Sequence, residues 1–315
     1  MSTPAFGAAT CHRPRLIILI RHGESESNRD KTINQHTPNH LIPLTENGWK
    51  QSRQVGIDLL RVLNLDNYDI VDDLEKRYAT PNEPTKKLPL KGYSPQNKKR
   101  DSTIVFYTSP YKRTRQTLKG ILDVFDDYNE LNSGVEVREE ERYQPCGRSK
   151  FAQWYPPTFP SGYYENKNTQ DPDGLFADKQ FLLYRVKDDP RIREQDFGNF
   201  QQVTSMQDVM KKRSTYGHFF YRFQEGESAA DVYDRVASFQ ETLFRYFERT
   251  NKKPRDVVVL VTHGIYCRVF LMKWFRWTYE EFESFTNVPN GSMIVMEFDE
   301  TIDAYVLRTE LPKWC

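Results

Sequence analysis

The chain has 315 residues and almost no net charge, because 45 basic residues are balanced by 44 acidic ones to leave a formal charge of +1. This balance excludes a chain-wide electrostatic attraction to nucleic acid or to an anionic membrane, so any affinity for anions must be local. The sequence is 37% hydrophobic and 14% aromatic, which is enough for a sizeable core and does not indicate large-scale disorder. No apolar run approaches the ~18 residues of a membrane span, and the start of the chain lacks the apolar stretch of a signal peptide.

The cysteines are too widely spaced for a zinc motif or a dense disulfide framework, and they are Cys11, Cys146, Cys267 and Cys315. We therefore expect free thiols in a reducing, cytoplasmic setting. Two short basic runs, at 98–100 and 211–213, leave a nuclear location open, although such runs more commonly lie on a solvated surface. Asn290-Gly291-Ser292 fits a glycosylation sequon, but an Asn-Gly pair just before a strand-like run is better interpreted as a turn.

The first half of the chain reads as two strand-helix units. An apolar run at 16–20 predicts a buried strand, and after a polar loop Thr45 is placed to cap a helix. The apolar stripe of that helix comprises Val55, Leu59, Leu60 and Leu63. Residues 66–101 are charged and contain prolines, so we expect a solvated insertion there. A second strand is predicted at 104–108, followed by a helix from about 111 to 128.

The second half begins with an irregular, aromatic-rich segment at 142–182, which we expect to pack as a lid or cap. Helices are predicted at 205–213 and 228–249, a third apolar strand begins at Val257, and a closing pair of strands lies near Met293 and Tyr305. This alternation predicts a three-layer α/β/α sandwich with a mostly parallel central sheet. We expect a flexible tail at 1–13 and a single domain over 14–315.

Two of the predicted strands deliver a histidine and then a glycine, at 16–23 and at 257–264. Ligands bind outside the carboxyl ends of strands in open α/β sheets, so His22 and His263 could share one site. A lone histidine is usually structural. Here Arg21 offers a planar fork of donors, Asn28 an amide, and Gly23 room for close backbone approach, and this composition suits an oxyanion. His22 is therefore a candidate nucleophile for phosphoryl transfer.

The strand at 104–108 leads into the start of a helix, which is itself a favourable place for an anion. Arg113 lies in the first helical turn, where a cation opposes the helix dipole and would gain from a bound phosphate. Arg115 lies about 200° further round the helix. We therefore interpret Arg113 as a binding residue and Arg115 as a surface charge.

Three ordered motifs carry a resemblance to a known family: Arg21-His22-Gly23-Glu24-Ser25 with Asn28, Ser-Pro-x-x-Arg-x-x-Gln-Thr at 109–117, and Thr-His-Gly at 262–264. Together they resemble the histidine phosphatase superfamily, in its phosphoglycerate mutase-like branch. Further matching positions are found at 44–51 and 226–235, so the resemblance runs from about 16 to 298. The aromatic insertion and residues 186–277 are most similar to fungal broad-range acid phosphatases of this family.

The resemblance implies a role for each matching residue. His22 would become a phosphohistidine, and the residues that would hold the phosphoryl group are Arg21, Asn28, Arg113, His263 and Gly264. The family's proton donor precedes a glycine, and Ile192-Arg193-Glu194-Gln195-Asp196-Phe197-Gly198 fits; we assign Glu194, with Asp196 as a rival that would point to the opposite side of an extended segment. Glu24 is interpreted as a scaffold residue. No metal or other cofactor is expected, and a protonated Glu194 would favour mildly acidic pH.

The expected activity is the hydrolysis of small phosphate monoesters, with no nucleic-acid partner. A phosphoglycerate mutase would use the same residues but needs further basic groups for a carboxylate, and residues 197–201 do not match the mutase pattern. A phospho-ligand-binding pseudoenzyme is the other alternative, although every catalytic position is filled. A kinase-linked bisphosphatase is disfavoured because the sequence has no Gly-x-x-x-x-Gly-Lys loop. The substrate and the oligomeric state are left open.

Overall fold

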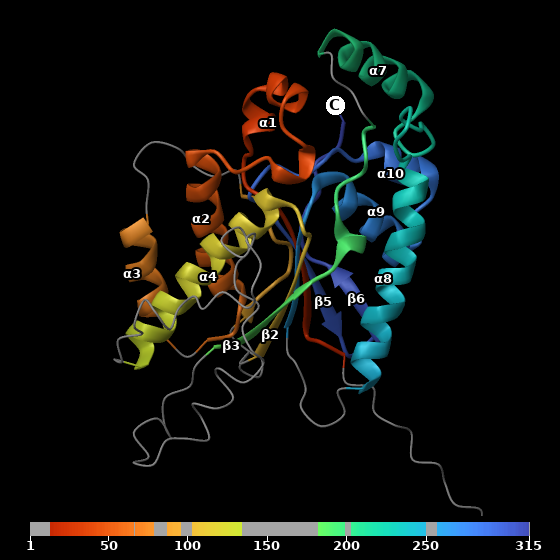
Figure 1. The fold of residues 1–315 in the computed structure, drawn as a ribbon. Coiled ribbons are helices and arrows are strands. Elements are labelled where there is room, and N and C mark those ends of the chain that lie inside the picture. The colour runs from red at the N-terminus through yellow and green to blue at the C-terminus, as the bar shows by residue number, and fades with distance from the viewer. Residues whose placement is uncertain are drawn as a thin grey trace, which may run out of the picture.

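A six-stranded sheet forms the centre of the structure (Figure 1). The computed structural model describes residues 13–65, 67–78, 87–95, 103–133, 182–198, 203–249 and 257–314. The strand order is β3-β2-β4-β1-β5-β6, and the bounds are β1 Leu16–Arg21, β2 Thr103–Thr108, β3 Leu183–Asp188, β4 Val257–Thr262, β5 Met293–Asp299 and β6 Ala304–Leu307. β3, β2, β4 and β1 are parallel, whereas β5 is antiparallel to both of its neighbours. The predicted mostly parallel sheet is confirmed.

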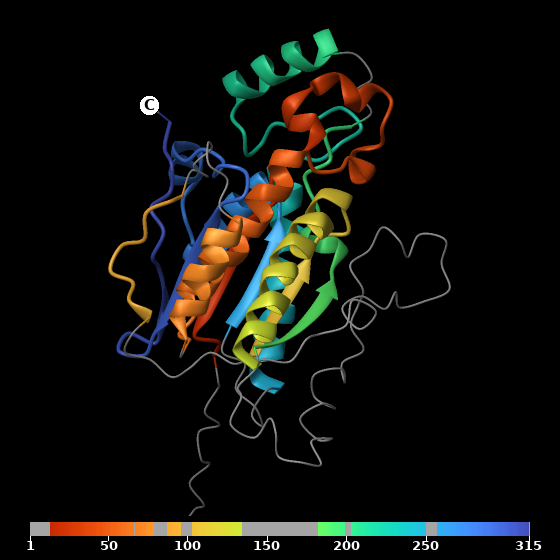
Figure 2. The same cartoon turned by 90° about the vertical axis from the view of Figure 1, so that its left-hand side faces the viewer.

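Helices cover both faces of the sheet. Figure 2 views it through the helices on one face, α2 Glu46–Val62, α3 Tyr68–Tyr78 and α4 Lys112–Ser133. The other face is covered by α8 Ala229–Arg249 and α9 Gly264–Phe275. The remaining helices of the described chain are α1 Glu26–Arg29, α7 Val203–Tyr216, α10 Tyr279–Ser284, and the 3₁₀ helices η1 Lys31–Gln35, η2 Asn39–Leu41 and η5 Pro190–Ile192. The three-layer α/β/α prediction is therefore confirmed.

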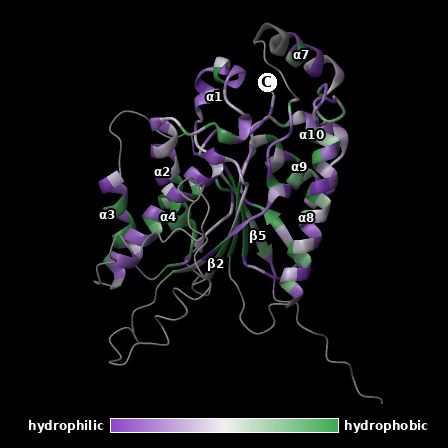
Figure 3. Cartoon of the chain, viewed as in Figure 1, coloured by the Kyte–Doolittle hydropathy of each residue, from purple (hydrophilic) through white to green (hydrophobic). Residues whose placement is uncertain are grey.

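The apolar runs of the central strands are continuous because both faces of the sheet are buried. In β1, Leu16, Ile18 and Ile20 pack into the core beneath α2, α3 and α4. Ile17 and Leu19 alternate with them and pack into the core beneath α8 and α9. Figure 3 shows the same distribution, with hydrophobic residues concentrated in the strands between the helical layers.

The sheet register places the two histidines side by side. Arg21 at the end of β1 is paired with Thr262 at the end of β4, so the next residue on each strand leaves the sheet at the same edge. β2 runs parallel on the other side of β4, with Thr108 opposite Val261, and brings the start of α4 to that edge as well. The carboxyl ends of three adjacent strands therefore meet in one place, as expected of an α/β ligand site.

Two elements correct the sequence interpretation. Residues 68–78, expected to be part of a solvated insertion, form α3, in which Val71 and Leu74 are buried against the core. The pattern was missed because Val71 and Leu74 are the only fully buried side chains of a strongly charged helix, whereas Tyr68, Ile70 and Tyr78 pack against the same core but are only partly buried. β3 was not predicted either. It lies at the edge of the sheet, and edge strands commonly carry charged residues in place of a continuous apolar run.

Several expectations fall outside the described residues. These include the aromatic-rich segment up to 181, nearly all of the predicted tail, the basic run at 98–100, and three of the four cysteines. Cys267 is described, and it is a buried free thiol. None of the helices in the described ranges is both long enough and apolar enough to cross a membrane.

Candidate active site

His22 is the first residue after β1, and its backbone and side chain are both tied down. The backbone N–H donates to Thr262 O at 3.0 Å, while His22 O accepts from the backbone N–H of Gly291 and from Asn290 Nδ2. The ring is 3% exposed, and Nδ1 lies 2.7 Å from Gly23 O. Because a carbonyl can only accept, Nδ1 carries the proton and Nε2 presents its lone pair.

Burial, followed by the nearby charges of Arg113 and Arg21, lowers the pKa of His22 well below its ordinary value. The ring is therefore neutral at neutral pH. Its Nε2 accepts a hydrogen bond from Arg113 Nε at 3.2 Å. A neutral imidazole with one nitrogen fixed and the other facing a guanidinium is suited to attack a group that the guanidinium also binds.

The turn after His22 depends on a contact between two glycines. A Cβ atom at Gly23 would overlap the carbonyl of Gly48 at the start of α2, and one at Gly48 would overlap the carbonyl of Glu24. Gly23 was predicted to permit close backbone approach, and the backbone that approaches it in this structure is that of α2. Glu24 accepts from Thr45 Oγ1 at 2.7 Å, which matches its interpretation as a scaffold residue.

Arg113 is the second residue of α4, in the first helical turn as predicted, and it is 3% exposed. Its Nη1 donates to the backbone and side-chain oxygens of Asn39 at 2.7 and 3.0 Å. The guanidinium also lies over the ring of Tyr111, 4.8 Å from the ring centre. These contacts direct its remaining N–H groups toward His22 and His263, where they can donate hydrogen bonds to a bound anion.

His263 is the first residue after β4 and the N-cap residue of α9, and its ring is fully buried. Its Nε2 lies 2.9 Å from Ser109 Oγ, which also accepts, at 3.4 Å, from the backbone N–H of Tyr111. Among the described residues, Nε2 is the acceptor available to the buried Ser109 hydroxyl proton. Ser109 therefore donates to Nε2, and the ring proton is on Nδ1.

This tautomer directs the Nδ1–H of His263 into the site, where Glu194 Oε2 lies 3.6 Å away. Arg113 Nη2 lies 3.4 Å from the same nitrogen, so two N–H donors meet there, and an oxyanion placed between them would accept from both. Burial and, next, the charge of Arg113 lower the pKa of His263 well below its ordinary value, so the ring stays neutral. The rings of His22 and His263 meet edge to face, with centres 5.2 Å apart.

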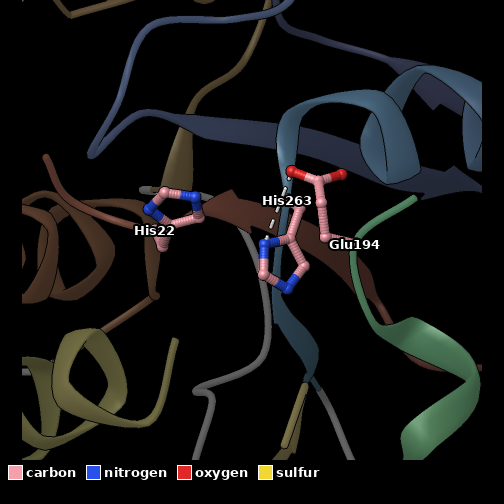
Figure 4. Close-up of side chains that lie close together, drawn as sticks. All are labelled: His22, Glu194 and His263. Carbon is pink, nitrogen blue, oxygen red and sulfur yellow. Dashed lines mark ion pairs between the residues drawn. The ribbon is translucent and has the colours of Figure 1, made fainter. Parts of the chain in front are cut away.

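Glu194 follows η5 and reaches the two histidines from the side of β4 opposite α4. Its Oε1 accepts from the backbone N–H of Gln195 at 3.1 Å. Burial raises the pKa of the carboxyl, although Arg113 acts in the opposite direction. Figure 4 shows the carboxylate beside His263, with His22 across the site. Asp196, the rival carboxylate, is exposed and caps Gly198 N at 2.9 Å.

The donor atoms of His22, Glu194 and His263 lie within 4.8 Å of one another, a separation that could in principle surround a metal ion. The charges around them oppose this. Arg113 Nε already occupies the lone pair of His22, and the guanidinium of Arg21 lies close enough to lower the pKa of both histidines. Two guanidinium groups beside the cluster disfavour a dication and favour an anion.

Arg21 is held at the edge of the site by a 2.5 Å hydrogen bond from Nη1 to Val288 O. Its Nε is buried and has no hydrogen-bond partner among the described residues, so one donor remains available to a ligand. Gly264 makes room for this side chain, because a Cβ atom there would lie 3.2 Å from Arg21 Nε and 3.0 Å from the side chain of Asn287.

Asn28 is exposed, and its Oδ1 accepts from the backbone and hydroxyl of Ser25 and from Asn290 Nδ2 at 3.1 Å. Through Asn290, Asn28 supports the turn that carries His22. The sequence interpretation missed this connection, although it did predict the turn at 290–291, which forms with Gly291 at φ +64°.

Two arginines were wrongly interpreted as surface charges. Arg115 is 7% exposed and donates from Nη2 to Asp188 at the end of β3 at 2.5 Å. Arg213 is 9% exposed, and its Nη2 donates to Gln195 Oε1 at 3.1 Å. Each partner is distant in sequence, and nothing local to the arginine signals it.

The family model of the histidine phosphatase superfamily (branch 1) matches residues 17–80 and 175–308. The broad-range acid phosphatase DET1 of Saccharomyces cerevisiae is 66% identical, with the match covering 98% of this chain and 92% of that protein. The phosphoglycerate mutase-like protein AT74 of Arabidopsis thaliana is 33% identical over 96% of this chain and 72% of its own length. The native structure of a mycobacterial glucosyl-3-phosphoglycerate phosphatase shares the fold, with a TM-score of 0.50 and 15% identity over 96% of this chain and 100% of that one. On these findings, and on the three motifs that meet at the edge of its sheet, this chain belongs to the histidine phosphatase superfamily.

Proposed function

We propose that this protein is a phosphatase that hydrolyses phosphate monoesters through a phosphohistidine on His22, without a metal ion or other cofactor. The observation that carries the proposal is the Nε2 lone pair of a neutral, buried His22 facing Arg113 at 3.2 Å. A carboxyl whose pKa is raised by burial lies on the other side of the same site. Family membership supports the same reaction.

In the first step His22 Nε2 attacks phosphorus, and the bond from phosphorus to the ester oxygen breaks. Arg113 turns its Nε–H from His22 to a phosphoryl oxygen, and Arg21 and the Nδ1–H of His263 bind the others. Donors placed where negative charge develops lower the barrier without a metal. Glu194, protonated at the outset, gives its proton to the leaving alkoxide, so a neutral alcohol departs.

In the second step a water molecule attacks the phosphohistidine. Glu194, now a carboxylate, accepts the proton of the water while the bond from phosphorus to Nε2 breaks. Inorganic phosphate is released, and His22 returns to its neutral form with Nδ1 still donating to Gly23 O. One carboxyl thus serves as acid and then as base.

We further propose a broad substrate range, like that in the name of the relative with 66% identity, and a single phosphatase domain over 14–315. The described site recognises the phosphoryl group through Arg21, Arg113 and His263. Asn28 would contribute through its amide, and the backbone at Gly264 through its position at the start of α9. The recognition of the leaving group is assigned to the segments at 29–43, 66–101 and 142–182, and cytoplasmic location is part of the same proposal.

The test is hydrolysis of p-nitrophenyl phosphate in EDTA by the wild-type protein and by His22→Ala. We expect turnover in the wild type and none above background in the variant. Mass spectrometry of wild-type protein quenched without acid should show a phosphoryl adduct on His22. Equal turnover by both proteins would refute the proposal.

A phosphoglycerate mutase is the alternative, because a relative with 33% identity bears that resemblance in its name. It is distinguished by following 3-phosphoglycerate by NMR. The phosphatase releases inorganic phosphate, whereas the appearance of the 2-isomer without free phosphate would establish the mutase in its place.

A further inference from the structure

One buried arginine outside the phosphoryl-binding group binds the segment that carries Glu194. Arg235 lies in α8, and its side chain is 10% exposed. Its Nη1 donates to Arg191 O at 2.7 Å and to Arg193 O at 2.8 Å. Its Nη2 donates to the backbone carbonyl of Glu194 itself at 3.1 Å. A single guanidinium therefore binds three carbonyls within four consecutive residues.

Glu227 accepts hydrogen bonds both from Arg235 and from the segment that carries Glu194. Its carboxylate oxygens accept from Arg235 Nε at 3.3 Å and Nη2 at 3.1 Å. They also accept from the backbone N–H of Asp196 at 3.0 Å and from the side chain of Arg193. The backbone N–H of Glu227 donates to Asp196 O at 2.8 Å. Both ends of the segment at 193–196 are thus bound by one arginine-glutamate pair.

The segment needs this support because it forms no helix or strand. Residues 194–198 lie beyond η5 in irregular backbone, so their carbonyls have no ladder partners. Buried carbonyls without partners are costly, and the planar guanidinium supplies several donors in a fixed arrangement. The backbone position of Glu194 therefore depends on a side chain from α8 more than on its own secondary structure.

We propose that Arg235 is the positioning residue of the proton donor: it holds the backbone of Glu194 so that the carboxyl faces the leaving-group oxygen. The inference rests on the proposed function and names a residue that acts through Glu194 without touching the substrate. A displacement of about 1 Å at a catalytic group can lower a rate by roughly 100-fold, so loosening this backbone should weaken proton donation selectively.

The leaving group provides a readout that a merely structural role would not change. p-Nitrophenolate leaves without protonation, whereas the alkoxide of glycerol 2-phosphate needs a proton. The ratio of kcat/KM for these two substrates reports the first step for each. Loss of proton donation lowers kcat/KM for glycerol 2-phosphate alone, while general damage to the site lowers both values together.

The variants are Arg235→Met, which removes all donors at similar volume, and Arg235→Lys, which keeps the charge but cannot bind the carbonyls as a fork. Arg268→Met is the matched control, because Arg268 is 4% exposed and donates to the carbonyl of Phe282, away from Glu194. In Arg235→Met we expect kcat/KM for glycerol 2-phosphate, relative to kcat/KM for p-nitrophenyl phosphate, to fall about 10-fold or more. In Arg235→Lys the same ratio should fall less. The control should keep the wild-type ratio. If Arg235→Met does not fold, Arg235→Lys alone decides.

Combination with Glu194→Gln separates this inference from the proposed function. By itself Glu194→Gln should lower kcat/KM for glycerol 2-phosphate by roughly 100-fold or more while retaining most of kcat/KM for p-nitrophenyl phosphate, because this constant does not include the later attack of water on the phosphohistidine. Arg235→Lys should then produce no further change in the ratio. The positioning role would be overturned if Arg235→Lys lowered kcat/KM equally for both substrates. It would also be overturned if Arg235→Lys changed the ratio as much in the Glu194→Gln background as in the wild type. If Glu194→Gln itself is unselective, the assignment of the proton donor fails instead.

Discussion

The pH dependence of turnover should depend on Glu194, and Glu194→Gln is the substitution that isolates it. In the reaction proposed above, the first step needs a protonated Glu194 and a neutral His22 at the same time. The carboxyl loses its proton as pH rises through its raised pKa, which creates an alkaline limb in the profile. The imidazole becomes neutral as pH rises through its lowered pKa, which creates an acidic limb.

The two pKa shifts increase the fraction of molecules in which Glu194 is protonated while His22 is neutral. With ordinary pKa values of 4.5 for the glutamate and 6.5 for the histidine, about one tenth of each group would be in the required form midway between those values. The competent fraction would then be about 1%. Burial moves both pKa values in the direction that enlarges this fraction, by at most ~100-fold. The site thereby makes the competent protonation state more common than it would be at ordinary pKa values.

The assay is kcat/KM for glycerol 2-phosphate across the acidic and neutral range. Glu194→Gln should lower the maximum by roughly 10² to 10⁴-fold and remove the alkaline limb. Asp196→Asn is the matched control, because this exposed carboxyl lies two residues away and its amide replacement can still accept from Gly198 N. If Glu194→Gln keeps the wild-type alkaline limb, that limb belongs to ionisation of the substrate phosphate, and the reasoning is refuted.

Other consequences can be measured independently. Ser109→Ala should lower kcat/KM at least about 10-fold with little change in thermal midpoint, because His263 loses the hydroxyl that fixes its tautomer; unchanged kinetics would exclude that role. Gly48→Ala should lower the free energy of unfolding in urea by about 2 kcal/mol or more, because its Cβ atom would overlap the carbonyl of Glu24. Cys267 should resist iodoacetamide in the native protein, since burial raises its pKa to about 12, and mass spectrometry after native labelling checks this. Turnover should survive EDTA; a loss that an added divalent cation restores would contradict the metal-independent reaction.

The arrangement of Arg21, His22, Arg113 and His263 could be predicted from the sequence for a physical reason. Each lies at or just beyond the end of an apolar strand, and parallel strands bring such ends together at one edge of the sheet. The apolar runs also defined the layers, since a strand buried on both faces has no polar alternation. The local sequence pattern was therefore sufficient to predict a contact wherever that contact followed from the register of neighbouring strands.

The sequence pattern did not predict contacts between side chains on elements whose proximity depends on the tertiary structure. Arg115 was misjudged because its partner, Asp188, lies 73 positions away on an edge strand with no apolar run. Asn39 could not be assigned to the site, because its contact with Arg113 depends on the path of an irregular loop. Such contacts depend on tertiary structure, and neither residue has a local signal that would reveal its partner.

The two histidines, equivalent in sequence and in sheet register, differ in which nitrogen is occupied. In His22 the Nδ1–H is bound by Gly23 O, so the lone pair of Nε2 faces the site. In His263 the Nε2 atom is bound by Ser109, so the Nδ1–H faces the site. One ring therefore presents a nucleophile and the other a donor. Because both rings are buried and neutral, this difference comes from hydrogen-bond partners and not from charge, which supports attack by His22 and phosphoryl binding by His263.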